Sequence, residues 1–417
     1  MKGPKYSIVL PTFNRAAFLP LAVESVLNQT FEDFELVISD GGSTDDTVEV
    51  VGGFSDDRIR LVTSKTKLTM AENYERALDH AAGEFVIFFS DDDAFVPDML
   101  ERVDEAISES GAKMLVFQIA YFHHENILTA NGRVGKNSLS VPRCTEVVSE
   151  VPSEAAIKRT FSVVGLSDEK IDMRYLYPLI GNVVCNRLLL ERLKEKTGNL
   201  FGSVPIDIFF ITLVLSAIRS YVVIDAPLLV CSQWSQNSSV GVLPGGKRLQ
   251  EHYEKLLDGE EMEFVPLKFA LPLNCSANAV LKAREVVGGH LKALEPNWGA
   301  YFSRTFDELV YLNTEGVDVA DELKEFQKVL SGQREDIRSR VPSSTPAVVS
   351  KIKRFMKTTP LPISRVWRSL RNWNSGAVDP RSQMDIVASN EGHFENFLQG
   401  AEYLFRKRDK TLRRSDR

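Results

Sequence analysis

The sequence lacks any long apolar run. No segment approaches the roughly 20 consecutive apolar residues that a membrane-spanning helix needs, and Met1 to Lys5 lead into a strand-like segment without the apolar stretch of a signal peptide. We therefore expect a cytoplasmic protein. Cysteine is also scarce, and the four residues are far apart and form no CxxC pair: Cys144, Cys185, Cys231 and Cys275. Neither a zinc site nor a disulfide framework is indicated.

Positive charge is in deficit over the chain as a whole. The 417 residues include 57 acidic and 50 basic side chains, a formal net charge of −7, which argues against nucleic acid as a partner. Residues 350–374 are the exception, because Lys and Arg interleave there with aromatic and aliphatic residues and no acid occurs. This stretch either contacts the inner face of a membrane peripherally or packs on its own domain. Pro360 and Pro362 shorten any amphipathic helix, which favours packing.

Strand-like runs alternate with helical patterns over the first 120 residues or so. The runs YSIVL, FELVIS and FVIFF read as strands, and 70–81 reads as a helix that Thr69 caps. This alternation predicts an α/β fold with a Rossmann-like, mostly parallel sheet flanked by helices. The loop-like 235–246 separates two predicted domains, 1–240 and a mainly helical 241–417. The basic residues from Arg406 onward predict a disordered tail.

Acidic residues gather where the predicted strands end. Asp40 follows the second strand, and Asp91 to Asp93 follow FVIFF. Ligands bind at the carboxyl ends of parallel strands, and repulsion between carboxylates there is relieved by Mg²⁺ or Mn²⁺, which prefer one or two carboxylates plus water and phosphate oxygens. The alternatives are a helix cap near Pro97, for which one aspartate would suffice, and a plain turn at Asp40.

Two adjacent histidines, His123 and His124, precede Glu125 and resemble a small metal cluster. Neighbouring side chains on a strand point to opposite faces, so these histidines cannot easily share one ion. We interpret them as solvated or acceptor-facing. His393 is assigned no role.

Four motifs occur in a fixed order in the first 100 residues: PTFNR at Pro11 to Arg15, DGGSTDDT at Asp40 to Thr47, NYERALDHAAGEF at Asn73 to Phe85, and SDDDAFVPDML at Ser90 to Leu100. In order and spacing they resemble the family 2 glycosyltransferases, which have a GT-A fold and invert the anomeric centre. The resemblance covers roughly the first 240 residues. It implies a nucleotide-sugar donor, usually a uridine diphosphate (UDP) sugar, with Mn²⁺ or Mg²⁺ bridging the diphosphate.

The resemblance also implies a set of donor-binding residues: Pro11, Thr12, Phe13, Arg15, Asp40, Asn73, Asp91 and Asp92. Pro11 and Thr12 would lie beside the nucleoside, and Asp40 would bond the base. The family's DxD element falls on SDD, in which Ser90 replaces the first aspartate. Asp92 thereby becomes the leading metal ligand, and Asp93 can substitute for the missing carboxylate.

The general base implied by the resemblance is Asp207, in the segment PIDIFF that precedes APLLV at Ala226 to Val230. Ile206 replaces the acidic neighbour usual in the family. Asp207 also fits a plainer role, as a carboxylate at the positive end of a helix dipole. Downstream, Gln233 and Ser235 stand where the family often has arginine and histidine, so Arg15, Lys65 or Lys67 would contact the phosphates. Trp234 is either packing or an acceptor platform.

The predicted function is metal-dependent transfer of a sugar to a hydroxyl of a glycan or lipid-linked acceptor, in polysaccharide or glycan biosynthesis. One alternative is a non-catalytic nucleotide-sugar or glycan-binding protein, because Ser90, Ile206 and Gln233 depart from the family pattern. The second is a nucleotidyltransferase. PTFNR lacks the glycine-rich phosphate-binding pattern, which argues against that alternative and against a dinucleotide dehydrogenase.

Overall fold

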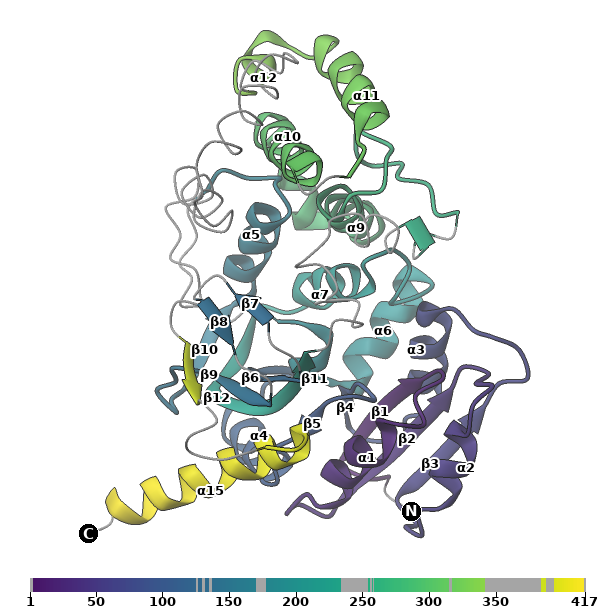
Figure 1. Cartoon of the computed structure of the whole chain (residues 1–417), viewed down its shortest axis with the longest axis vertical. Coiled ribbons are helices and arrows are strands. Elements are labelled where there is room, and N and C mark those ends of the chain that lie inside the picture. Colours follow the sequence, from purple (N-terminus) through teal and green to yellow (C-terminus); the bar gives the residue numbers. More distant parts are fainter. Residues whose placement is uncertain are drawn as a thin grey trace.

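A computed structural model of the chain is shown in Figure 1. It describes residues 3–124, 127–129, 132–134, 137–169, 178–233, 254–255, 257, 259–314, 317–341, 384–387 and 394–415. Several sequence predictions therefore lie outside the described residues. These are the basic stretch 350–374, Glu125, Trp234, Ser235, His393 and the boundary at 240/241.

The strands are β1 (Tyr6–Thr12), β2 (Phe34–Asp40), β3 (Ile59–Thr63), β4 (Phe85–Phe88), β5 (Ala94–Phe95), β6 (Met114–His123), β7 (Ile127–Thr129), β8 (Gly132–Val134), β9 (Ser138–Pro142), β10 (Val148–Pro152), β11 (Val183–Asn186), β12 (Ser220–Gln233) and β13 (Met384–Val387). The α-helices are α1 (Leu19–Leu27), α2 (Thr47–Gly52), α3 (Met70–Asp79), α4 (Met99–Ser110), α5 (Ser153–Val163), α6 (Arg187–Thr197), α7 (Ile206–Ser216), α9 (Pro272–Val287), α10 (Trp298–Thr314), α11 (Ala320–Ser331), α12 (Glu335–Arg338) and α15 (Phe397–Ser415). Two short 3₁₀ helices are η1 (Ile180–Asn182) and η2 (Gly289–Ala293).

The main sheet has the strand order β10-β12-β6-β11-β4-β1-β2-β3. Neighbours β3, β2, β1 and β4 run parallel, as do β6 and β12. Strand β11 lies antiparallel between β4 and β6. The predicted mostly parallel sheet with flanking helices is confirmed. Its parallel strands end at one edge, at Thr12, Asp40 and the segment after Phe88.

Side chains of the central strands alternate between two hydrophobic layers. Val9 and Phe88 belong to the layer under α3, α6, α7 and α9, whereas Ile8, Leu10 and Ile87 belong to the layer under α1, α2 and α4. Strand β4 is buried at all four positions because helices cover both faces of the sheet. This burial explains why FVIFF is a continuous apolar run.

Two helix starts follow from local sequence. Thr69 caps α3 as predicted: its hydroxyl accepts from the Glu72 amide at 3.2 Å, and the Glu72 carboxylate accepts from the Thr69 amide at 2.7 Å. Helix α4 begins at Met99, two residues after Pro97, with Asp98 preceding its first turn.

The C-terminal region is mainly helical, as predicted, and shares a core with the sheet domain. Helix α9 packs against α7 (Figure 1), and a single buried cluster extends from Phe88 and Phe210 through Cys275 to Phe302 and Phe326. The division of the chain at 240/241 stays a prediction. Within the described residues, the two parts have continuous packing.

The last helix, α15, returns to the sheet domain. Phe397, Ala401 and Leu404 are buried against β5 and β12, and Arg408 forms an ion pair with Asp98 at the start of α4. The prediction of a disordered tail after Arg406 is wrong, because α15 continues to Ser415. Its helical conformation extends from a segment that tertiary packing has already ordered.

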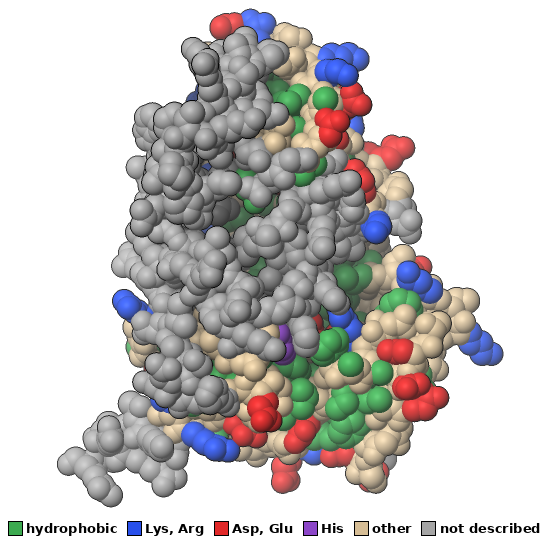
Figure 2. Space-filling model, in the orientation of Figure 1, with side chains coloured by type: hydrophobic (Ala, Val, Ile, Leu, Met, Phe, Trp, Pro, Cys, Tyr) green, Lys and Arg blue, Asp and Glu red, His purple; other side chains and the backbone are tan. Residues whose placement is uncertain are grey.

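No helix among the described residues is long and apolar enough to span a membrane. On the face shown in Figure 2, acidic side chains are scattered with basic ones over the described part of the surface.

Candidate active site

The predicted donor-binding residues lie along one edge of the sheet. Pro11 and Thr12 end β1, with Phe13 and Arg15 in the loop that follows; Asp40 ends β2, Asn73 is on α3, and Asp91 and Asp92 follow β4. Thr12 and Asp40 are paired in the register of β1 and β2. The fold therefore brings these residues to one rim.

The loops after β1 and β2 are joined by hydrogen bonds. The Asn14 amide donates to the Ser43 hydroxyl at 2.8 Å, and the Thr44 amide donates to the Asn14 side chain at 2.8 Å. The Ala16 amide donates to the Asp45 carboxylate at 3.1 Å. Asn14 adopts a φ of 54°, a left-handed conformation that asparagine tolerates. Together the two loops form one wall of the rim.

Asp40 and Gly42 shape the second loop. Both carboxylate oxygens of buried Asp40 accept from the Ser43 amide, at 3.1 and 3.3 Å. Gly42 has a φ of +87°, and a Cβ there would lie 2.6 Å from the Thr66 carbonyl oxygen. Only glycine fits this position, which allows the loop after β3 to pack directly against the loop after β2.

Basic side chains approach this rim from two loops. The Lys67 ammonium lies 5.2 Å from the centroid of the Phe13 ring, within cation–π range. The Arg15 Nε lies 3.6 Å from Asp91 Oδ1. Lys65 is exposed. Positive charge is thus present beside the predicted nucleotide position, although the predicted phosphate contacts stay predictions.

Asn73 joins three elements behind the rim. Its amide nitrogen donates to the Thr12 carbonyl at 3.1 Å, and its amide oxygen accepts from the Ser39 hydroxyl at 2.7 Å. Asn73 is buried. Its polar group is therefore occupied within the scaffold, where it fixes the ends of β1 and β2 relative to α3. A direct donor contact by Asn73 stays a prediction.

Asp91 is a buried carboxylate, with 9% of its surface exposed. The Thr12 hydroxyl donates to its Oδ2 at 2.7 Å. Burial, followed by the charge of Asp92, raises the pKa of Asp91 to about 7, against the lowering effects of Thr12 and Arg15. A cation bound here would offset the cost of burying the Asp91 charge and its repulsion by the charge of Asp92.

Asp93, the last residue of the acidic turn Asp91 to Asp93, is hydrogen-bonded to β12. Its Oδ1 accepts from the Ser232 amide of β12 at 2.9 Å. Burial, followed by the charge of Asp92, raises the pKa of Asp93 well above the usual aspartate value. One oxygen of Asp93 thus anchors the acidic turn to β12. Its predicted role as a metal ligand is untested.

Asp207 lies in the first turn of α7 and is half-buried. Its Oδ1 accepts from the amide of Ile208 at 2.9 Å, and burial raises its pKa. The charge of Asp207 and those of Asp91 to Asp93 all act on the Tyr74 hydroxyl. Its pKa is raised by burial and then by the charges of four aspartates, namely Asp91, Asp207, Asp93 and Asp92. The acidic turn (Asp91 to Asp93) and the predicted base therefore affect the same phenol group electrostatically.

Sequence reasoning missed Tyr74. Its ring packs against Phe88 and Phe201, with centroid separations of 5.9 and 5.2 Å. Phe201 also stacks on Phe210 of α7 at 5.2 Å. In the sequence Tyr74 reads only as an apolar position of a helix. Nothing at that level indicates that carboxylates from two distant segments raise the pKa of its hydroxyl.

The carboxylates of Asp91 and Asp92 fit a divalent cation only as a partial ligand set. Among the described residues, no three His, Cys, Asp or Glu side chains converge as a metal site would require. Mg²⁺ commonly takes one or two carboxylates and completes its shell with water and substrate phosphate. The buried, mutually repelling pair suits an ion of that kind, bound together with a diphosphate.

The two histidines at the end of β6 face different strands. His123 Nε2 lies 2.8 Å from the Ser140 hydroxyl, whereas His124 Nε2 lies 3.3 Å from the Ser232 hydroxyl. Burial lowers the pKa of each to about 4. His123 is only 4% exposed, so the interpretation of this residue as solvated is wrong. Strand β9 covers it, which the polar sequence of that region did not indicate.

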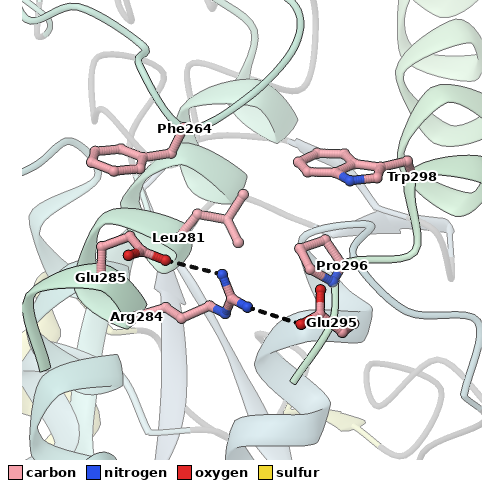
Figure 3. A pocket seen from close by; sticks show the side chains of 7 residues that line it. All are labelled: Phe264, Leu281, Arg284, Glu285, Glu295, Pro296 and Trp298. Atoms are coloured by element: carbon pink, nitrogen blue, oxygen red, sulfur yellow. Dashed lines mark hydrogen bonds and ion pairs between the residues drawn. The ribbon is translucent and has the colours of Figure 1, made fainter. Parts of the chain in front are cut away.

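A separate pocket of about 360 Å³ lies in the helical C-terminal region. In Figure 3 the rings of Phe264 and Trp298 lie across it from one another, and Arg284 reaches between Glu285 and Glu295. The Arg284 guanidinium also donates to two backbone carbonyls of the following segment. None of the predicted site residues lines this pocket. Its polar groups hold α9 to η2.

Part of the sequence matches a known protein family. The sequence model described as "Glycosyl transferase family 2" matches residues 7–159, which include β1 to β4 and the acidic turn. This segment is a family 2 glycosyltransferase domain. The predicted family is confirmed, and with the parallel sheet described above the glycosyltransferase domain has the predicted GT-A fold.

Curated relatives match the same part of the chain. A Campylobacter jejuni protein named GalNAc(5)-diNAcBac-PP-undecaprenol beta-1,3-glucosyltransferase is 39% identical over 112 residues, which are 26% of this chain and 36% of the relative. A Mycobacterium bovis PGL/p-HBAD biosynthesis glycosyltransferase is 38% identical over 120 residues, 28% of this chain and 47% of the relative. The chain thus spans less than half the length of these two relatives.

Solved structures similar to the glycosyltransferase domain and its C-terminal extension include that of Staphylococcus aureus TarS residues 1–349 in complex with UDP. The identity is 16%, the alignment covers 94% of this chain and 99% of TarS 1–349, and the TM-score is 0.48.

Proposed function

We propose that this protein transfers a sugar from a nucleoside diphosphate donor, with UDP as the leaving group, to a hydroxyl acceptor with inversion at the anomeric carbon. The family match of residues 7–159 supports sugar transfer. The geometry that supports the mechanism is the packing of Phe88, three residues before Asp91, against Phe210, three residues after Asp207, at a ring-centroid separation of 5.1 Å. Sugar transfer needs carboxylates with different tasks on the donor and acceptor sides, and we assign Asp91 and Asp92 to the first and Asp207 to the second.

On the donor side, the joined loops after β1 and β2 would hold the nucleoside, with Asp40 facing the base. Asp91 and Asp92 would hold Mn²⁺ or Mg²⁺ with the diphosphate. When bound, the cation stabilises the negative charge that develops on the leaving diphosphate. Thr12 keeps Asp91 oriented through its 2.7 Å hydrogen bond. Arg15 adds positive charge at the same edge.

On the acceptor side, Asp207 would take the proton from the attacking hydroxyl. Its place in the first turn of α7 fixes the carboxylate, because the Ile208 amide donates to one oxygen and leaves the other for the acceptor. Burial raises its pKa toward the working pH, which strengthens it as a base. Attack on the face opposite the diphosphate then gives inversion without a covalent intermediate.

The acceptor proposed is a glycan or a lipid-linked glycan, as in polysaccharide or glycan assembly. The name of the Campylobacter relative refers to an undecaprenol-linked substrate, which supports this class. An enzyme of this kind would act at the inner face of a membrane without spanning it. The described residues contain no spanning helix, and the basic stretch 350–374 is the proposed contact.

The test is a paired measurement of UDP binding and sugar turnover. Calorimetry should show much tighter UDP binding with Mn²⁺ or Mg²⁺, and Asp92→Ala should remove that enhancement. The matched control is Asp57→Ala, which changes an exposed acid outside the rim. Equal UDP affinity with and without the ion would refute the metal assignment.

For turnover, a panel of nucleotide sugars is screened for hydrolysis in the presence of the ion. Asp207→Asn should retain UDP binding and lower turnover by about 10²- to 10⁴-fold, the usual contribution of a general base. Full turnover in this variant would eliminate Asp207 as the base. A wild-type protein that binds UDP but turns over no sugar would instead be a nucleotide-binding protein that retains the fold.

A further inference from the structure

The loop that precedes Asp207 is held by two glutamates from opposite sides. This loop, Asn199 to Pro205, connects α6 to α7. On the sheet side, Glu75 of α3 accepts from the backbone amides of Leu200 and Phe201, at 2.5 and 3.2 Å. Glu75 is in turn paired with Lys194 at 2.9 Å. The first half of the loop is therefore fixed to the glycosyltransferase domain.

The second half of the loop is fixed to the C-terminal region. Glu260 accepts from the Ser203 hydroxyl at 2.5 Å and from the Val204 amide at 3.0 Å. Lys282 of α9 donates to the Gly202 carbonyl at 2.6 Å and to Glu260 at 3.0 Å. Three consecutive loop residues thus bond to one ion pair, immediately before the turn that bears Asp207.

The surroundings of the ion pair make these contacts strong. The side chains of Glu260 and Lys282 are 18% and 30% exposed, so water screens them only partly. Hydrogen bonds to charged groups are stronger than those between neutral groups. Helix α9, which bears Lys282, also packs against α7 (Figure 1), so one partner of the ion pair lies on an element in direct contact with the helix that begins at this loop.

We propose that Glu260 and Lys282 are positioning residues for Asp207, and that the C-terminal region is for this reason part of the transferase site. The inference rests on the proposed function. Residues beyond the family match supply the anchor that fixes the angle at which α7 begins. If the anchor is lost, Asp207 is displaced from the acceptor hydroxyl, while the donor-binding loops at the other end of the rim are unaffected.

The test compares Glu260→Gln and Lys282→Met with Glu285→Gln. The control removes a carboxylate on α9 that forms an ion pair of similar length, 2.9 Å to Lys292, and has no hydrogen bond to the loop. Three quantities are measured: amide hydrogen exchange of residues 199–208, the dissociation constant of UDP with Mn²⁺, and kcat for hydrolysis of the best nucleotide sugar of the panel.

Glu260→Gln and Lys282→Met should each accelerate amide hydrogen exchange of residues 199–208 by about tenfold, as expected for the loss of one strong hydrogen bond. They should lower kcat by about tenfold to a hundredfold, since a displacement of about 1 Å costs that much. The UDP dissociation constant should change by less than twofold. Glu285→Gln should leave all three quantities at wild-type values.

Unchanged kcat in variants with faster loop exchange would overturn the proposal, as would equal losses in kcat and UDP affinity. Unchanged loop exchange in both variants would also refute it. If Glu260→Gln fails to fold, Lys282→Met decides alone, because it retains the aliphatic stem. A wild-type protein without turnover refutes the transferase function itself, a result that differs from any outcome of the variants.

Discussion

Neutralising Asp91 should stabilise the metal-free protein. The structure raises the pKa of this carboxyl from 3.8 to about 7, through burial and the charge of Asp92. A difference of about three pH units corresponds to about 4 kcal/mol against the ionised folded state. Asparagine keeps the shape and can still accept the Thr12 hydrogen bond. The favourable effects of Arg15 and Thr12 on the ionised form are already included in that pKa. The expected gain for Asp91→Asn is therefore about 4 kcal/mol at pH 8.

The sign of the pH dependence follows from proton binding. Between about pH 4 and 7 the folded state binds the Asp91 proton and the unfolded state has released it. Wild-type stability therefore falls as pH rises through this window. The advantage of Asp91→Asn should grow from near zero at pH 4 to its full value above pH 7, in urea unfolding followed at each pH with a chelator present.

A control of opposite sign is Asp56→Asn. The hydrogen bond from Arg58 holds the pKa of Asp56 below its usual range, so neutralising Asp56 should destabilise the protein slightly at pH 8. Addition of Mn²⁺ with UDP should stabilise wild type more than Asp91→Asn. Equal stability of Asp91→Asn and wild type at pH 8, or a difference independent of pH, would refute the conclusion that burial and the charge of Asp92 disfavour the ionised form of Asp91.

Two further substitutions test the scaffold. Gly42→Ala places a Cβ 2.6 Å from the Thr66 carbonyl oxygen at a φ of +87°, so it should cost more than about 1 kcal/mol in urea unfolding and weaken UDP binding; normal UDP affinity would show that the loop adjusts freely. Leu404→Ala removes a buried side chain by which α15 packs on the sheet domain, and it should cost about 2–5 kcal/mol. A change below about 0.5 kcal/mol would mean that α15 does not contribute to the core.

The donor side of the site could be predicted from the sequence because its geometry is local. Thr12 and Asp40 are the last residues of two apolar strands and Asp91 comes three residues after a third, and parallel strands end at a common edge. The apolar run FVIFF predicts a central strand, and the acidic residues after it are therefore expected at that edge. The same reasoning predicted the cap at Thr69, since a capping box lies within four residues.

The rest depended on contacts between residues far apart in the chain. Nothing near Asp93 in the sequence indicates that it bonds the Ser232 amide, 139 residues away. The packing of α15 on β5 and β12 could not be predicted either, because its basic composition resembles a disordered tail. Hydrophobic spacing identifies a helix but does not say which surface it covers.

The relation between the acidic turn and Asp207 is a property of the core. Phe88 of β4 packs edge-on against Phe201 and Phe210, at 5.5 and 5.1 Å, and Phe201 stacks on Phe210. Asp91 follows Phe88 by three residues, and Asp207 precedes Phe210 by three. Because close-packed interiors transmit displacements, the two carboxylates are set relative to each other by this aromatic cluster. In the proposal above, the Glu260–Lys282 pair, which bonds to residues 202–204, holds the chain where it enters α7. With Asp207 as the proposed base, sugar transfer would need the first relation to align the donor with the base and the second to keep the base in place when the acceptor binds.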